Sequence, residues 1–304
     1  ALKLARRVTG RTNIVAFSQG FHGMTLGSLA CTANQYFRNA AGVPLNNVIH
    51  MPFENTLGCG LEYLKTMRAA FENTSSGYDL PAAFLVEPIQ AEGGVNVASQ
   101  EWLHGIQKLA HDLGALLIFD DIQAGCGRTG SYFSFDGMGL DPDIICLAKG
   151  IGGYGTPLAM NLVKPEHDKH WSPGEHTGTF RGQGISFVAG REGLRYFEDD
   201  SLMARTRERG FWLKNKLENL AAHYGHDQFK VRGKGMIYGI EVGHGDWAKA
   251  LARECFDNGL LIGPCGVSGN VLKIIPPLTI EDETLEAGMS ILFAAMDKKM
   301  KELL

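Results

Sequence analysis

The chain has 304 residues, of which 44% are hydrophobic and 20% charged, as is ordinary for a soluble globular protein. Its formal net charge is −4, so no basic excess points to nucleic acid or to an anionic membrane surface. No apolar run reaches the length of a membrane span, and we expect a cytosolic protein that binds neither nucleic acid nor membranes.

The six cysteines are scattered and form no C-x-x-C pair. We interpret them as reduced thiols. No cluster of cysteine and histidine has the spacing of a zinc site, so we expect no bound metal. The printed sequence begins with ALKLARRVTGR, which is typical of the end of a helix, and we expect that a further segment precedes it.

Short apolar runs alternate with helical patterns in the first two thirds of the chain. The runs are continuously apolar, as expected for strands covered on both faces, and they span 13–17, 82–88, 115–121, 143–149 and 157–163. A helix is predicted between the second and the third run, with Ser99 as its N-cap and Gly114 as its stop. Such strand–helix–strand units predict a largely parallel α/β sheet.

The pattern changes after about residue 195. A charged helix is predicted over roughly 199–222, one half-exposed strand over 230–242, and a last helix from near Thr279. We therefore predict two domains. A large α/β domain covers 1–195, with its N-terminal part missing from the printed sequence, and a smaller α+β domain covers 196–304.

Residues 125–130 read GCGRTG, a literal G-x-G-x-x-G. A dinucleotide site would need a strand that enters the first glycine and a helix that begins at the last one. Here Asp120–Ala124 intervene, and the segment after Gly130 is a poor helix sequence. We therefore interpret these glycines as a tight turn and not as a phosphate site.

Polar residues stand at the ends of three predicted strands. Asp120 and Asp121 end one, Lys149 ends the next, and Glu87 ends another, with Glu92 close behind. Ligands in open α/β sheets bind beyond the carboxyl ends of the strands. A lysine at such an end is a candidate reactive amine, although ordinary salt bridges would give the same pattern.

Six segments together resemble the class III aminotransferases, pyridoxal-phosphate enzymes of fold type I. The segments are FHGMT (21–25), EPIQAEGG (87–94), FDDIQAGCGRTG (119–130), PDIICLAKGIGGYGTPLA (142–159), GEHTGTFRG (174–182) and KIIPPLTI (273–280). They cover nearly the whole chain in the family's order. The resemblance implies a mostly parallel, seven-stranded sheet with helices on both faces and a smaller C-terminal α+β domain.

The resemblance also implies roles for single residues. Lys149 would bind the aldehyde of pyridoxal phosphate and shuttle a proton, and Asp120 would pair with the pyridine nitrogen. Gln123 would hydrogen-bond the 3′-oxygen of the ring. Phe21 would stack on the ring, with His22 shaping the turn beside it.

Further implied roles concern the phosphate and the substrate. Thr179 would bind the phosphate across the interface of a homodimer or a dimer of dimers. Glu92 would face the mobile arginine that binds substrate carboxylates. Lys273 replaces that family arginine, and Asp121 replaces a glutamate. Lysine offers a point charge in place of a bidentate fork, so another arginine could bind 2-oxoglutarate, although Arg128 is interpreted as structural.

The sequences DDIQAGCGRTG (120–130) and PGEHTGTFRG (173–182) are further similar to the diaminobutyrate–2-oxoglutarate branch of the family, which includes ectoine-pathway enzymes. The expected reaction converts L-2,4-diaminobutyrate and 2-oxoglutarate into L-aspartate 4-semialdehyde and L-glutamate. Alternatives are ornithine, 4-aminobutyrate or acetylornithine as amino donor, an aminomutase of the glutamate-1-semialdehyde type, and a chain without catalytic activity.

Overall fold

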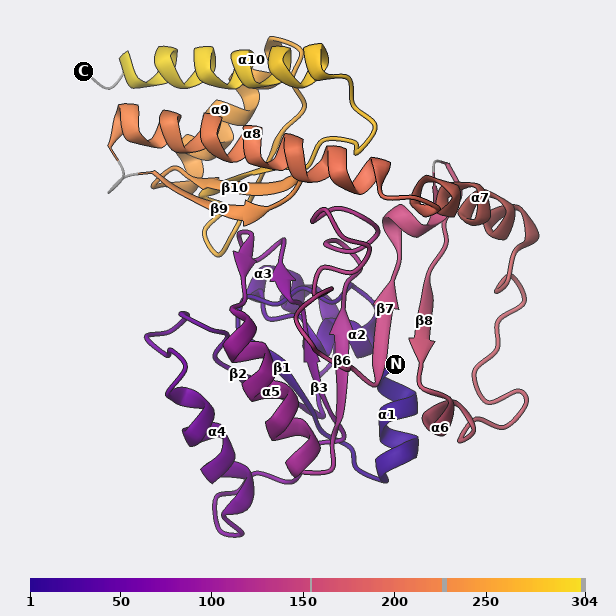
Figure 1. Cartoon of the computed structure of the whole chain (residues 1–304). Helices are drawn as coiled ribbons and strands as arrows, with labels where there is room; N and C mark the ends of the chain where they lie inside the picture. The colour runs from indigo at the N-terminus through magenta and orange to yellow at the C-terminus, as the bar shows by residue number, and fades with distance from the viewer. Residues whose placement is uncertain (154, 226–228, 302–304) are drawn as a thin grey trace. The chain divides into compact units, whose positions relative to one another are not determined.

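The computed structural model describes residues 1–153, 155–225 and 229–301 and contains two compact units (Figure 1). The first unit consists of Ala1–Ile89, Ala98–Cys126 and Phe133–Glu198, and the second of Gln90–Val97, Gly127–Tyr132 and Asp199–Leu304. Two short segments of the second unit thus interrupt the first unit in sequence. None of the helices in the described ranges is both long and apolar enough to cross a membrane.

A six-stranded sheet in the order β2-β1-β3-β6-β7-β8 forms the centre of the first unit. The strands are β1 (Ile14–Phe17), β2 (Val48–Met51), β3 (Ala83–Val86), β6 (Leu116–Asp120), β7 (Ile144–Leu147) and β8 (Met160–Val163). All neighbours are parallel except β7 and β8, which are antiparallel. The five predicted runs are confirmed as strands, whereas β2 is not predicted. The described residues form six strands where the resemblance implies seven.

Helices cover both faces of this sheet, as predicted. The core on one face contains Phe17, Phe84 and Phe119 together with residues of α4 (Tyr63–Glu72) and α5 (Gln100–Asp112). The core on the other face contains alternate strand residues together with α1 (Leu2–Thr9). The remaining short elements are α2 (Leu26–Cys31), α3 (Gln35–Arg38), η1 (Asn39–Ala41), β4 (Ile89–Gln90), β5 (Asn96–Val97), η2 (Lys149–Gly152), α6 (Pro165–Asp168), α7 (Gly184–Leu194) and η3 (Arg195–Phe197).

The predicted ends of α5 are confirmed. The Ser99 hydroxyl accepts a hydrogen bond from the Trp102 main-chain N–H at 3.1 Å, and Gly114 has a left-handed φ of 63°. Glu54 adds a contact that the sequence pattern does not reveal. Its carboxylate accepts hydrogen bonds from both the main-chain N–H and the hydroxyl of Ser99, each at 2.6 Å.

The second unit contains an antiparallel sheet in the order β11-β12-β10-β9 and three long helices. The elements are α8 (Ser201–Tyr224), β9 (Lys230–Lys234), β10 (Ile237–Glu241), α9 (Gly245–Asp257), β11 (Gly263–Cys265), β12 (Val271–Ile274) and α10 (Asp282–Lys301). The prediction of one strand over 230–242 is wrong, because Gly235 has a φ of 59° and turns the chain into a hairpin. The helices and the sheet share one apolar core.

Candidate active site

Polar side chains gather at the edge of the first sheet where its parallel strands end. Asp120 is the last residue of β6, and it pairs in register with Cys146 of the neighbouring strand β7. Lys149 begins η2, shortly after β7 ends. The strands β6 and β7 run in the same direction (Figure 1). Asp120 and Lys149 therefore reach the same edge of the sheet, as predicted.

His22 forms a buried pair with Asp120. Nδ1 of His22 lies 2.8 Å from Oδ2 of Asp120, and only 3% and 9% of the two side chains are exposed. Burial lowers the pKa of His22, but the hydrogen bond with Asp120 and the charges of Asp120 and Glu87 outweigh it, so the pKa lies above its ordinary value. The raised pKa favours the protonated imidazole, which donates this hydrogen bond to Asp120.

Glu87 holds the loop that carries Phe21 and His22. Its Oε1 accepts a hydrogen bond from the Phe21 main-chain N–H at 2.8 Å, and the Phe21 ring packs edge-on against Phe37 with centroids 5.4 Å apart. A Cβ atom at Gly20 would lie 3.0 Å from the Phe17 carbonyl oxygen and 3.1 Å from Nε2 of His22. Glycine thus leaves the space that the His22 ring needs.

Lys149 has an unusual backbone. Its φ is 53°, in the left-handed region that favours glycine. The next residue, Gly150, lies against Cys126, since a Cβ atom at Gly150 would be 3.1 Å from the Cβ of Cys126. Cys126 itself has a φ of 54°. Strained residues of this kind cluster at functional sites because the surrounding structure must hold them in place.

Asp121 makes a different contact, because its Oδ2 accepts a hydrogen bond from the Ser134 main-chain N–H at 3.0 Å. Gln123 lies half-buried in the turn that follows β6. Residues 122–130 form turns without a helix, which confirms that the glycine fingerprint lacks the context of a dinucleotide site. Thr179 lies exposed before α7, and its proposed contact with a phosphate stays a prediction.

Glu92 and Lys273 form an ion pair within the second unit, with 37% and 11% of their side chains exposed. The two predicted substrate residues therefore meet each other. Arg128 donates from Nη1 to the carbonyl oxygens of Met236, at 3.2 Å, and Pro276. Burial lowers the pKa of Arg128 to about 10. These contacts agree with the structural role predicted for Arg128.

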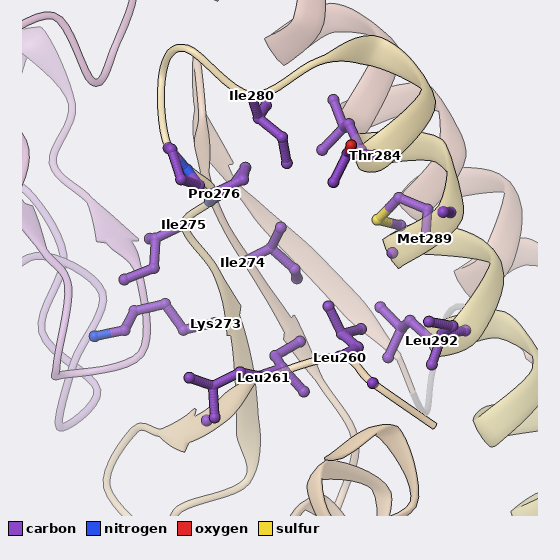
Figure 2. Close-up of a pocket in the computed structure, with 18 of the residues that line it drawn as sticks. Leu260, Leu261, Lys273, Ile274, Ile275, Pro276, Ile280, Thr284, Met289 and Leu292 are labelled. Carbon is purple, nitrogen blue, oxygen red and sulfur yellow. The ribbon is translucent and has the colours of Figure 1, made fainter. Parts of the chain in front are cut away.

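The second unit also contains an apolar pocket of about 710 Å³ beside α10, drawn in Figure 2. Leu260, Leu261 and Ile274 lie along it, and Lys273 stands at its edge with its amine extending away from the apolar side chains. Lys273 and Thr284 are the only residues with polar side chains among its described lining. The pocket therefore offers no acid–base pair for chemistry.

Two contacts of the candidate site were not predicted from the sequence. His22 was expected to shape a turn, but it binds Asp120 directly. Glu87 was recognised as a strand-end acid, but its bond to the Phe21 N–H was not. The available signal was the position of both residues after neighbouring parallel strands, which brings loops together without specifying which atoms meet.

Comparison with known proteins gives a consistent result. Residues 1–296 match the family described as aminotransferase class III. The chain is 46% identical to a diaminobutyrate–2-oxoglutarate transaminase of Sporosarcina pasteurii, over 99% of this chain and 71% of that protein. It is 45% identical to the transaminase of the same name from Marinococcus halophilus, over 99% and 70%. It is also 46% identical to an uncharacterized aminotransferase of Sinorhizobium fredii, over 96% and 65%.

Solved structures agree with the fold. An aminotransferase of Bacillus anthracis superposes with a TM-score of 0.84 at 26% identity, covering 98% of this chain and 73% of the other. An S-selective transaminase of an Arthrobacter species superposes with a TM-score of 0.86 at 23% identity, covering 99% and 73%. The second likeness supports the fold alone.

Proposed function

Because the chain belongs to the aminotransferase class III family, we propose that it transfers an amino group from L-2,4-diaminobutyrate to 2-oxoglutarate with the help of pyridoxal phosphate. The products are L-aspartate 4-semialdehyde and L-glutamate. The relatives named for this reaction, at 45–46% identity over nearly the whole chain, support the choice of substrates. The placement of Asp120 and Lys149 at one edge of the sheet carries the proposal of the cofactor.

The residues at this edge fit such a cofactor. When bound, pyridoxal phosphate supplies a pyridinium ring that accepts electron density from the reacting carbon. A buried carboxylate is needed to keep the ring nitrogen protonated, and Asp120 is 8% exposed and held by His22. A primary amine is needed to capture the aldehyde, and Lys149 provides one at the start of η2, just after the adjacent strand β7.

Each residue then has a distinct task. Asp120 would hold and orient the ring through its nitrogen, and His22 holds the Asp120 carboxylate in place by a hydrogen bond. The Lys149 amine moves a proton at the reacting carbon of the substrate. Phe21 would cover one face of the ring, Gln123 would donate to its 3′-oxygen, and Thr179 would bind the cofactor phosphate in a partner subunit.

The Glu92–Lys273 pair supports a role in substrate binding. The Lys273 side chain is largely buried, and its ammonium group forms an ion pair with the Glu92 carboxylate. A substrate carboxylate competes with Glu92 for the ammonium group, so binding of the acidic substrate releases the glutamate.

We also propose a homodimer. The helix α7 exposes apolar side chains, among them Ile185, Phe187 and Val188, with 69%, 51% and 63% of their surface accessible. Exposed apolar groups on one helix favour burial against another protein surface. The neighbouring Thr179 would thereby reach the partner's cofactor.

A donor panel tests the reaction. The full-length protein is incubated with 2-oxoglutarate and with diaminobutyrate, ornithine, 4-aminobutyrate or acetylornithine, and glutamate formation is measured. We expect diaminobutyrate to give the highest kcat/KM, and Lys149→Ala to abolish turnover. A higher value for another donor would refute the substrate assignment. Isomerisation of an amino aldehyde without any keto acid would instead identify an aminomutase.

A further inference from the structure

Asp121 is a buried acid that the proposed transamination leaves without a task. It is fully inaccessible to solvent, although it follows Asp120 directly. Its Oδ2 accepts the Ser134 main-chain N–H at 3.0 Å, whereas its Oδ1 has no hydrogen-bond partner. Within the described ranges, no lysine, arginine or histidine forms an ion pair with it.

The titratable groups that face Asp121 are also acids. Among the described residues, the charges that act on it are those of the preceding Asp120 and of Asp136, from the turn after Ser134. The main-chain N–H of Asp121 donates to the carbonyl oxygen of Cys146 of β7 at 3.1 Å. Burial raises the pKa of the Cys146 thiol to about 12, so this group is uncharged. An isolated carboxylate in such surroundings costs far more free energy than a neutral carboxyl group.

The main chain of Asp121 closes the turn that carries Gln123, and its carboxyl group packs against that turn. The Gly125 N–H donates to the carbonyl oxygen of Asp121 at 2.9 Å. A Cβ atom at Gly125 would lie 2.6 Å from both that oxygen and Oδ2 of Asp121. The turn therefore packs directly on Oδ2 of the carboxyl group, and only glycine fits at position 125.

We propose that Asp121 is a positioning residue carried as a neutral carboxylic acid, which holds the Gln123 turn while Asp120 alone bears the negative charge at the end of β6. The inference rests on the proposed function, because it concerns the residue beside the acid assigned to the cofactor ring. Burial raises the pKa of Asp121 to about 7, and the charges of Asp120 and Asp136 add to this, whereas hydrogen bonding from Ser134 acts against it. Loss of the proton places a second charge beside Asp120.

The first test is the pH dependence of stability in the full-length protein without cofactor. Asp121→Asn keeps the shape of the side chain and cannot ionise. A carboxyl group whose pKa is raised on folding destabilises the protein as the pH rises from its unfolded value of 3.8 through about 7. The folding equilibrium constant of the wild type should therefore fall about 100- to 1,000-fold relative to Asp121→Asn, since each pKa unit is a factor of ten.

Asp136→Asn is the matched control, because it removes an exposed carboxylate from the same turn. Because its charge is only a minor cause of the raised pKa of Asp121, it should change the pH dependence of stability much less than Asp121→Asn does. A constant difference between the wild type and Asp121→Asn across this pH range would overturn the proposal. Should Asp121→Asn fail to fold, infrared spectroscopy of the wild type near about pH 6 decides, because the neutral acid has a carbonyl stretch that the carboxylate lacks.

The second test concerns positioning. Pyridoxal phosphate is titrated into both proteins by absorbance, below and above about pH 7. We expect the affinity of the wild type to weaken about tenfold or more at alkaline pH relative to Asp121→Asn. Equal pH dependence in both proteins contradicts the positioning role. Absence of binding at every pH would refute the proposed cofactor, while the stability profile would still report on the proton of Asp121.

Discussion

The backbone conformation of Lys149 predicts how substitutions there change stability, whatever the catalytic role of its amine. A side chain in the left-handed region costs about 1 kcal/mol that glycine does not pay. Lys149→Gly should therefore be more stable than Lys149→Ala by about 1 kcal/mol in urea unfolding, although both lose the amine. Equal stability, or a more stable alanine variant, would show that the φ of 53° carries no strain.

The His22–Asp120 pair predicts a pH-dependent stability. Since the pKa of His22 is raised in the folded protein, its contribution is fully present below about pH 6.5 and is lost as the pH rises through the folded value. The difference in Tm between the wild type and His22→Asn should thus shrink as the pH rises. His223→Asn, on the exposed end of α8, controls for loss of an imidazole. A difference that grows with pH would contradict the raised pKa.

The elements differ in how far the sequence predicts them. β3 and β6 were predictable because continuously apolar runs identify strands that are covered on both faces. β2 has a weaker pattern because its residues are only partly buried. The cap of α5 was predictable from Ser99, whereas Glu54 comes from 45 residues away and only folding brings it there. The pairing of His22 with Asp120, 98 residues apart, has the same limit.

The hairpin of β9 and β10 depends on two properties of Gly235. Its φ is 59°, and a Cβ atom there would lie 2.5 Å from the carbonyl carbon of Thr129. The conformational penalty alone lowers the free energy of unfolding by about 1 kcal/mol. Because the new Cβ also clashes, Gly235→Ala should lower it by a further amount of about 2 kcal/mol or more. Gly243→Ala is the matched control, because Gly243 has a φ of 84° and nothing within 4 Å of its missing Cβ. Chemical denaturation of both variants measures the difference, and equal losses would exclude a role for the close contact.

At the scale of the whole molecule, the exposed apolar face of α7 predicts that the protein forms a homodimer. Val188→Asp places a charge where the proposed homodimer buries apolar surface, so its dimer dissociation constant should rise at least about tenfold. Val267→Asp is the control, since Val267 is 68% exposed and belongs to the second unit. Sedimentation velocity at several concentrations distinguishes the two variants. A dimer that withstands Val188→Asp but not Val267→Asp would place the interface elsewhere.

The chain passes between its two units after residues 89, 97, 126, 132 and 198. Most of the second unit, including β9 and the strands beside it, comes from the C-terminal third of the chain. The unit also includes the segment with Glu92 and the segment with Arg128, which in sequence lie within the first unit. Arg232 donates to the Gly94 carbonyl oxygen at 2.7 Å, which ties one of these inserted segments to β9. Residues 199–304 alone therefore do not make up the whole second unit. In a chimera that exchanges only 199–304 with a relative, the new residues would pack against segments 90–97 and 127–132 of the original protein. A chimera should therefore exchange all three segments together.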